Sequence, residues 1–196
     1  MISAKEFHDQ CKVVLLGAAN SGKTTTLRQL IDGEFLESSP TLGTNLSIYE
    51  CRVKNEKIKL NIWDTAGQET YRKLAKIYYR DCNVALVFFD VTSKESYQDV
   101  KYWISELDSC GPPYYETIIV ANKVDQEREV TSDQGSELAR RSKACYMEIS
   151  AKTGQNVKNL FNLVASKFYQ IKDDLTKNRR LSYVSECSPN RKSSCC

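Results

Sequence analysis

Eight residues near the N-terminus, GAANSGKT at positions 17–24, constrain this chain more than any other segment. They match the spacing G-x-x-x-x-G-K-[ST], with an apolar strand-like run before them at 11–16 and a helical pattern after them at 23–31. The glycines let backbone N–H groups turn toward phosphate oxygens, and the helix N-terminus adds partial positive charge. Lys23 offers a positive charge to the β- and γ-phosphates, and the Thr24 hydroxyl is a hard oxygen ligand for Mg²⁺. The segment therefore predicts a nucleotide phosphate site, for which a Gly-rich turn is the alternative explanation.

Apolar β-rich runs alternate with helical patterns along most of the chain. Strands are predicted at 11–16, 44–53, 57–63, 84–89, 117–121 and 145–149, and helices at 23–31, 71–79, 96–109, 131–142 and 156–172. This alternation predicts an α/β domain in three layers, a six-stranded, mostly parallel sheet with helices on both faces. The tight turn at 54–56 predicts one antiparallel edge strand. We expect one domain over residues 1–174 and a flexible tail over 175–196, where Ser, Lys, Arg and Asn dominate.

The charge and the cysteines exclude some classes of protein. The formal net charge is +3, and residues 172–196 hold six Lys and Arg against three Asp and Glu, so the remainder is formally neutral. A neutral domain argues against a nucleic-acid partner. The basic tail would suit an anionic membrane surface, but on charge alone a solvated tail is an equal explanation. The eight cysteines include no C-x-x-C pair, and residues 1–10 lack the apolar run of a signal peptide. We therefore expect reduced thiols in the cytosol rather than a disulfide scaffold.

Two further polar segments follow predicted strands at the sheet edge where ligands of α/β proteins bind. Asn122-Lys123-Val124-Asp125 follows the strand at 117–121, and an Asp125 carboxylate can accept both the ring N1–H and the exocyclic amine of guanine. The aliphatic stem of Lys123 can cover the base. In isolation this tetrapeptide favours a polar turn, and its position after the strand is what supports a role at the base. Ser150-Ala151-Lys152 follows the strand at 145–149 and would reach the same base through its backbone.

The segment DTAGQE at 64–69 suits the chemistry of the terminal phosphate. Asp64 would anchor the Mg²⁺ shell, Gly67 would bring its N–H to the phosphate, and Gln68 would orient the attacking water. A Gly-containing strand-to-helix turn explains the same residues. The last two residues are Cys195-Cys196, which are more simply explained as lipid-attachment sites than as two incidental thiols. Two prenyl chains would meet the requirement for stable anchoring. The end is not a C-a-a-X motif.

In the order GAANSGKT, PTLG, WDTAGQE, NKVD and SAK, these motifs resemble those of the Ras superfamily, and its Rab branch in particular, over about residues 8–172 plus the terminal cysteines. The resemblance implies the three-layer P-loop NTPase fold and a small GTPase that binds GTP or GDP with Mg²⁺, hydrolyses GTP slowly and acts as a membrane-anchored switch in vesicle trafficking. It also implies exchange factors, GTPase-activating proteins, prenyl-escort and dissociation-inhibitor proteins, and effectors of the GTP state. The expected location is the cytoplasmic face of an intracellular membrane, in exchange with the cytosol.

The resemblance also implies roles for individual residues. Gln68 would be catalytic, and the metal ligands would be Thr24, Thr41 and Asp64. The nucleotide would contact Ala19, Asn20, Ser21, Gly22, Lys23, Thr24, Thr25, Phe35, Thr41, Gly67, Asn122, Lys123, Asp125, Ser150, Ala151 and Lys152. Effectors would face Leu46, Trp63 and Tyr78, and lipid would be attached at Cys195 and Cys196.

Several positions depart from the usual Rab pattern. Ala19 and Asn20 lie where a side chain could crowd Gln68, and Thr41 follows Thr24 by 17 residues, one fewer than is usual. Leu46 replaces a phenylalanine, and Thr70 replaces a common arginine. A nucleotide-bound scaffold with little hydrolysis is therefore an alternative. A P-loop kinase is a further one, in which NKVD would have no role.

Overall fold

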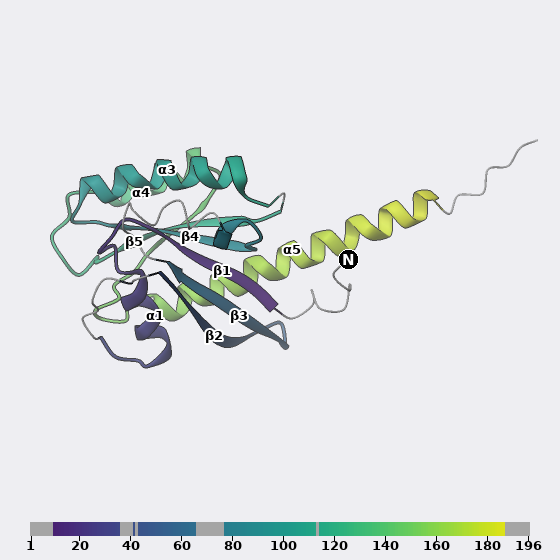
Figure 1. Cartoon of the computed structure of the whole chain (residues 1–196), viewed down its shortest axis with the longest axis horizontal. Helices are drawn as coiled ribbons and strands as arrows, with labels where there is room; N and C mark the ends of the chain where they lie inside the picture. Colours follow the sequence, from purple (N-terminus) through teal and green to yellow (C-terminus); the bar gives the residue numbers. More distant parts are fainter. Residues whose placement is uncertain (1–9, 36–40, 42, 66–76, 113, 187–196) are drawn as a thin grey trace, which may run out of the picture.

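A six-stranded sheet covered by helices on both faces makes up the protein (Figure 1). The computed structural model describes residues 10–35, 41, 43–65, 77–112 and 114–186, with side chains described as far as residue 176. The strands are β1 (Gln10–Gly17), β2 (Thr44–Val53), β3 (Glu56–Thr65), β4 (Val84–Asp90), β5 (Glu116–Asn122) and β6 (Cys145–Glu148). The helices are α1 (Lys23–Ile31), α3 (Lys94–Cys110), α4 (Ser132–Arg141) and α5 (Val157–Glu186). The predicted three-layer α/β fold is confirmed.

The strand order β2-β3-β1-β4-β5-β6 places β1 in the middle of the sheet. Every neighbouring pair is parallel except β2 and β3, so the predicted antiparallel edge strand is confirmed. Lys54 and Asn55 both have positive φ, 47° and 68°, and they form the two-residue turn whose twist matches a hairpin. Because the chain winds outward from β1 in both directions, the loops at the carboxyl ends of the central strands meet at one edge.

The core has two halves, one on each face of the sheet. On β1, Cys11, Val13 and Leu15 face the layer formed by α1 and α5, whereas Val14 and Leu16 face α3 and α4. All seven residues of β4 are buried, since helices cover both of its faces. That double burial explains why the central strands are continuous apolar runs in the sequence.

The C-terminal helix is longer than predicted. We expected it to end at 172, but α5 continues to Glu186, and Figure 1 shows this part of the helix extending beyond the sheet. Residues 157–186 contain no Gly or Pro, and Pro189 is the first helix breaker, so polar composition alone was a poor signal for the helix end. Most of the helix predicted at 71–79 lies outside the described residues; positions 77–79 are helical.

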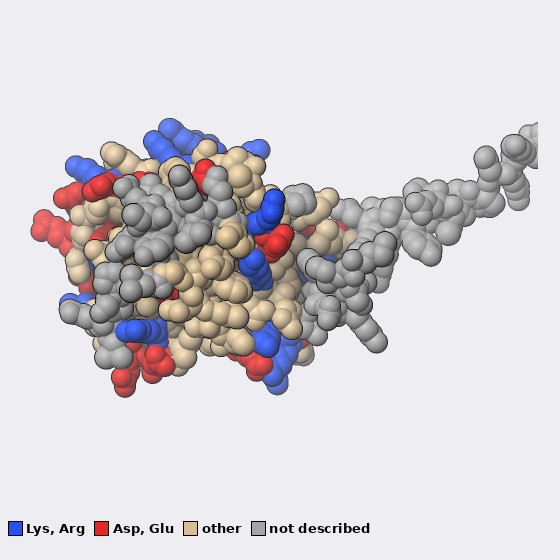
Figure 2. All heavy atoms as spheres, viewed as in Figure 1, with Lys and Arg blue, Asp and Glu red and all other residues tan. Residues whose placement is uncertain are grey.

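The described surface carries both signs of charge. In the view of Figure 2, Lys and Arg side chains alternate with Asp and Glu side chains around the rim of the domain. None of the described helices is long and apolar enough to cross a bilayer. The cysteines of the described part, Cys11, Cys51, Cys82, Cys110 and Cys145, form no disulfide, as predicted.

Candidate nucleotide site

The predicted site residues that the structure describes gather at the carboxyl edge of the sheet. Strand register places Leu15 of β1 beside Asp64 of β3, and Gly17 beside Phe88 of β4. The last residue of β4, Asp90, pairs with Asn122, the last residue of β5. Four strands therefore deliver their C-terminal residues to one edge, as the sequence predicted for the phosphate, metal and base motifs.

The loop at 17–24 depends on two glycines. A Cβ on Gly17, at φ 135°, would lie 2.3 Å from the carbonyl oxygen of Phe88. A Cβ on Gly22, at φ 89°, would lie 2.0 Å from Asn122 Nδ2. Any larger residue would push the loop away from β4 or β5, so the glycines let the loop turn tightly against the sheet.

The helix that follows the loop begins without a side-chain cap. Ser93 caps α3 and Thr131 caps α4 through hydrogen bonds to backbone N–H groups. In α1 the N-cap is Gly22, which makes no such bond. Gly22 has no side chain that could cap the first turn of α1, and the N–H groups of this turn, together with the helix dipole, form the kind of site that binds a phosphate.

Lys23 is a buried cation at the centre of this loop. Its Nζ donates hydrogen bonds to the carbonyl oxygens of Gly17, at 2.9 Å, and Ala18, at 2.8 Å. Burial lowers the pKa of the Lys23 ammonium to about 8, since removal from water disfavours the charged form. A phosphate bound at the loop would stabilise the charged form of Lys23, which burial disfavours.

Three oxygens that could hold Mg²⁺ converge beside the loop. Thr24 Oγ1 donates to Asp64 Oδ2 at 2.6 Å and lies 2.9 Å from Thr41 Oγ1, which must donate because Thr24 has a single hydroxyl proton. Asp64 Oδ1 is a buried oxygen that has no hydrogen-bond partner among the described residues, and burial raises the pKa of this carboxyl. These hard oxygens fit a Mg²⁺ ion and its waters. The short spacing from Thr24 to Thr41 does not keep Thr41 from the site.

The base motif is held to the phosphate loop by Asn122. Its Nδ2 donates to the carbonyl oxygen of Ser21 at 2.9 Å, and its Oδ1 accepts from the N–H of Ala151 at 3.0 Å. Asp125 is exposed, and its Oδ1 accepts a hydrogen bond from Ser150 Oγ at 2.6 Å. The motifs at 17–24, 122–125 and 150–152 are therefore joined by direct hydrogen bonds into one site.

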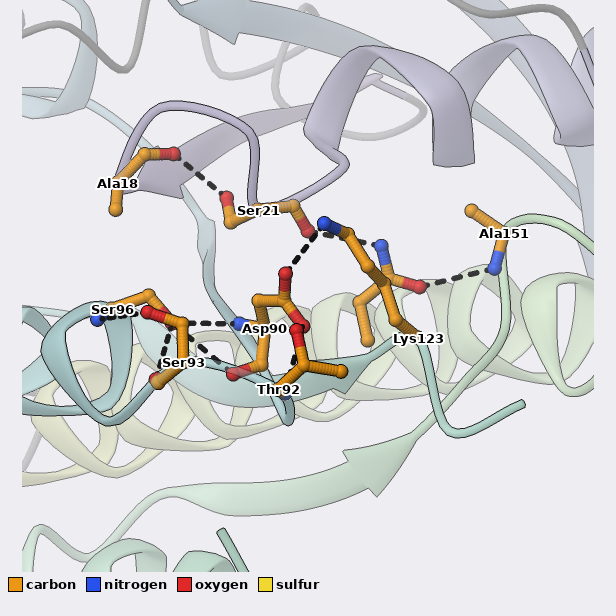
Figure 3. Close-up of polar contacts among 9 residues, drawn as sticks. Ala18, Ser21, Asp90, Thr92, Ser93, Ser96, Lys123 and Ala151 are labelled. Atoms are coloured by element: carbon orange, nitrogen blue, oxygen red, sulfur yellow. Dashed lines mark hydrogen bonds and ion pairs between the residues drawn. The ribbon is translucent and has the colours of Figure 1, made fainter. Parts of the chain in front are cut away.

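Asp90 is a member of this site that the sequence analysis missed. Its Oδ2 lies 2.5 Å from Lys123 Nζ, and Figure 3 shows the ammonium directed toward the carboxylate at the end of β4. Lys123 itself has a left-handed backbone, with φ 67°. Its place in the sequence could have identified it, because Asp90 ends the apolar run of β4 just as Asn122 ends that of β5.

An ion pair away from the loop edge was also missed. Arg128, three residues after Asp125, makes two hydrogen bonds to Glu148 of β6, at 2.8 and 2.7 Å. Glu148 also accepts from Ser132 and Tyr146, and the Arg128 guanidinium holds the pKa of this carboxyl at about 2. The pair ties the loop after β5 to the strand before residues 150–152.

The remaining predicted residues have these positions. Ala19, Asn20 and Lys152 are exposed, Thr25 is half-buried on α1, and Phe35 is 42% exposed beyond the end of α1. Leu46 pairs with Trp63 in the β2–β3 ladder and is 50% exposed, and the rings of Trp63 and Tyr78 lie 5.3 Å apart, so these three side chains share one surface. The predicted roles of Gly67, Gln68, Cys195 and Cys196 concern positions outside the described residues.

Comparison with known proteins gives a consistent set of relatives. The model of the Ras family matches residues 12–170. The chain is 38% identical to the Ras-related protein Rab-5B of Plasmodium falciparum (isolate 3D7), over 81% of this chain and 77% of that protein. It is 35% identical to human Ras-related protein Rab-17, over 94% and 90% of the two chains, and 34% identical to human Rab-30, over 82% and 80%.

Proposed function

The chain belongs to the Ras family and is a Rab-type small GTPase, and from this we propose that it is a membrane-anchored switch in vesicle trafficking that binds GTP or GDP with Mg²⁺. The observation that carries the proposal is the joining of phosphate, metal and base groups at one sheet edge. The side chain of Asn122 bonds both the phosphate loop, through Ser21, and the 150–152 loop, through Ala151.

For the phosphates, we assign Lys23 and the backbone of Ala19, Asn20, Ser21, Gly22, Thr24 and Thr25. Lys23 would leave the carbonyls of Gly17 and Ala18 in part to meet the β- and γ-phosphate oxygens. Thr24, Thr41 and Asp64 would hold the Mg²⁺ ion, directly or through water. When bound, the metal supplies charge neutralisation for the phosphate oxygens.

For the base, we assign Asp125 as the acceptor for the N1–H and amine of guanine. Ser150 already donates to Asp125 Oδ1, which orients the carboxylate and stabilises its charge. Asn122 would act through the loops that it joins. Lys123 would cover one face of the base with its stem, while Phe35 would approach from the other side and Lys152 would border the pocket.

Hydrolysis and switching would use residues at the γ-phosphate. Gln68 would orient the attacking water, and Gly67 and Thr41 would bind the phosphate only while it is present. Loss of the γ-phosphate would release these contacts and change the surface near Leu46, Trp63 and Tyr78 that effectors contact. We expect slow intrinsic hydrolysis, because an activating protein normally supplies an arginine.

A nucleotide-bound scaffold with little hydrolysis is the second candidate. The specific observation is Asn20, an exposed residue in the left-handed conformation (φ 61°) at the tip of the phosphate loop, where its side chain would meet an incoming arginine. The two candidates differ in whether partners distinguish the nucleotide states.

A pulldown from cell extract decides between these candidates. The protein loaded with a non-hydrolysable GTP analogue is expected to retain a set of proteins that the GDP form does not, because the γ-phosphate orders the effector surface. Two controls are used: beads that carry the nucleotide-free protein, and beads that carry a Leu46→Asp, Tyr78→Ala double variant. Identical partner sets in both nucleotide states would support the scaffold and overturn the switch.

Membrane attachment would use the tail. We propose a domain over residues 1–174 and a tail over 175–196, the first part of which, up to Glu186, is the end of α5 rather than a flexible segment. The tail would carry prenyl groups on Cys195 and Cys196, with the help of an escort protein and a dissociation inhibitor. Exchange factors and GTPase-activating proteins would control the cycle at the cytoplasmic face of an intracellular membrane. Mass spectrometry of the C-terminal peptide from cell-expressed protein should show two prenyl additions, and free thiols at both cysteines would rule out this anchor.

A further inference from the structure

Asp90 is a buried carboxylate in the nucleotide site that none of the phosphate, metal or base roles above uses. It ends β4, and its side chain is only 10% exposed. A buried carboxylate is unfavourable unless it is paired and hydrogen-bonded, so its contacts indicate what it does.

The chain holds the Asp90 carboxylate in one orientation. Its Oδ1 accepts hydrogen bonds from the backbone N–H of Thr92, at 2.9 Å, and from Thr92 Oγ1, at 2.8 Å. The backbone N–H of Asp90 donates to Oγ of Ser96, a residue in the first turn of α3, at 3.0 Å. Figure 3 shows Asp90 between Ser96 and Lys123, with Thr92 beside its carboxylate. With Oδ1 occupied by Thr92, Oδ2 is left for Lys123.

Lys123 is thereby fixed at both ends. Its backbone lies between Asn122, which is buried, and Val124, whose N–H donates to the carbonyl of Ile149 at 3.3 Å. Its ammonium lies 2.5 Å from Asp90 Oδ2, with 30% of the side chain exposed. A lysine stem has several rotatable bonds, and an ordinary surface lysine samples many rotamers. Here the two fixed ends leave the stem few of them.

We propose that Asp90 is a positioning residue for guanine binding, which orders the Lys123 side chain before the nucleotide arrives. The inference rests on the proposed base role of Lys123 and deepens it. Because the stem is already ordered, less rotamer entropy is lost when the base packs against it, and the base is released more slowly. Asp90 acts through Lys123 and does not itself contact the nucleotide.

The test measures release of fluorescent GDP from the full chain with Mg²⁺. Asp90→Asn is expected to speed release about tenfold, the equivalent of one freed long side chain. Asp90→Glu, which keeps the charge, should recover part of that loss. Glu50→Gln is the matched control, since it breaks an exposed 2.6 Å pair with Lys57 on the β2–β3 hairpin and should leave release unchanged.

A double-mutant cycle separates positioning from a general structural effect. In a Lys123→Met background, Asp90→Asn should speed release no further, because the group it positions is gone. Equal acceleration in both backgrounds, or wild-type release by Asp90→Asn alone, would overturn the positioning role. Failure of the wild-type chain to bind GDP at all would instead contradict the proposed function, so the two failures are distinct.

Discussion

Replacing Asp125 with Asn is expected to weaken GDP binding by about 10²- to 10⁴-fold. The carboxylate would accept two hydrogen bonds from guanine, and hydrogen bonds to a charged group contribute about 1.5–3 kcal/mol each. An Asn amide keeps one acceptor oxygen but presents its NH2 to the other guanine donor, so one charge-assisted hydrogen bond becomes a neutral one and the other contact becomes repulsive. Xanthine has an oxygen in place of the exocyclic amine, and the Asn amide can donate to it. The variant should therefore prefer xanthosine diphosphate.

Competition between fluorescent GDP and unlabelled GDP, xanthosine diphosphate and ADP measures this preference. Glu127→Gln is the matched control, because Glu127 is an exposed acid two residues away in the same loop and should leave all three affinities unchanged. An Asp125→Asn protein that keeps wild-type GDP affinity and gains none for the xanthine nucleotide would refute the assignment of Asp125 to the base.

Lys23→Met is the second change with a large expected effect. It removes the buried ammonium of the described phosphate loop. We expect GDP affinity to fall about 10³-fold, because the variant could not donate two charged hydrogen bonds to the phosphates. Stability of the nucleotide-free protein should change by only about 1 kcal/mol. The variant loses the bonds to Gly17 and Ala18, but it also loses a cation whose pKa burial lowers to about 8.

Isothermal titration with GDP and Mg²⁺, together with urea unfolding of the nucleotide-free protein, separates these effects. Lys101→Met, at an exposed position on α3, is the control and should leave both measurements unchanged. Wild-type GDP affinity in Lys23→Met would contradict the phosphate site. A collapse of stability would instead mean that Lys23 serves mainly to hold the loop.

Much of the fold was predictable because the local signals agree with the tertiary structure. The helix predicted at 23–31 and the strand predicted at 44–53 match α1 and β2 residue for residue, since the Gly-rich loop, the apolar alternation and the Lys54-Asn55 turn all indicate the same boundaries. The end of α5 was not predictable from composition. Its polar continuation to Glu186 contains nothing that breaks a helix.

The gathering of the site was predictable from strand ends, but its inner contacts were not. Thr24, Asp64 and Asn122 each follow a recognisable pattern in the sequence. The pairing of Asp90 with Lys123 depends on the register of β4 against β5, and no spacing in the sequence reports which side chains a sheet brings side by side. The Arg128–Glu148 pair was hidden for the same reason, since the two residues meet only after β5 and β6 are paired.

Single-turnover hydrolysis of GTP by the purified chain with Mg²⁺ tests the central claim most directly. We predict that bound GTP is converted to GDP and one phosphate per protein, slowly by itself and faster when GTPase-activating protein is added, because the proposed site would bind the phosphates and base while a partner would supply the arginine. Bound GTP that stays intact, with and without activating protein, would contradict the claim that this chain is a hydrolytic switch.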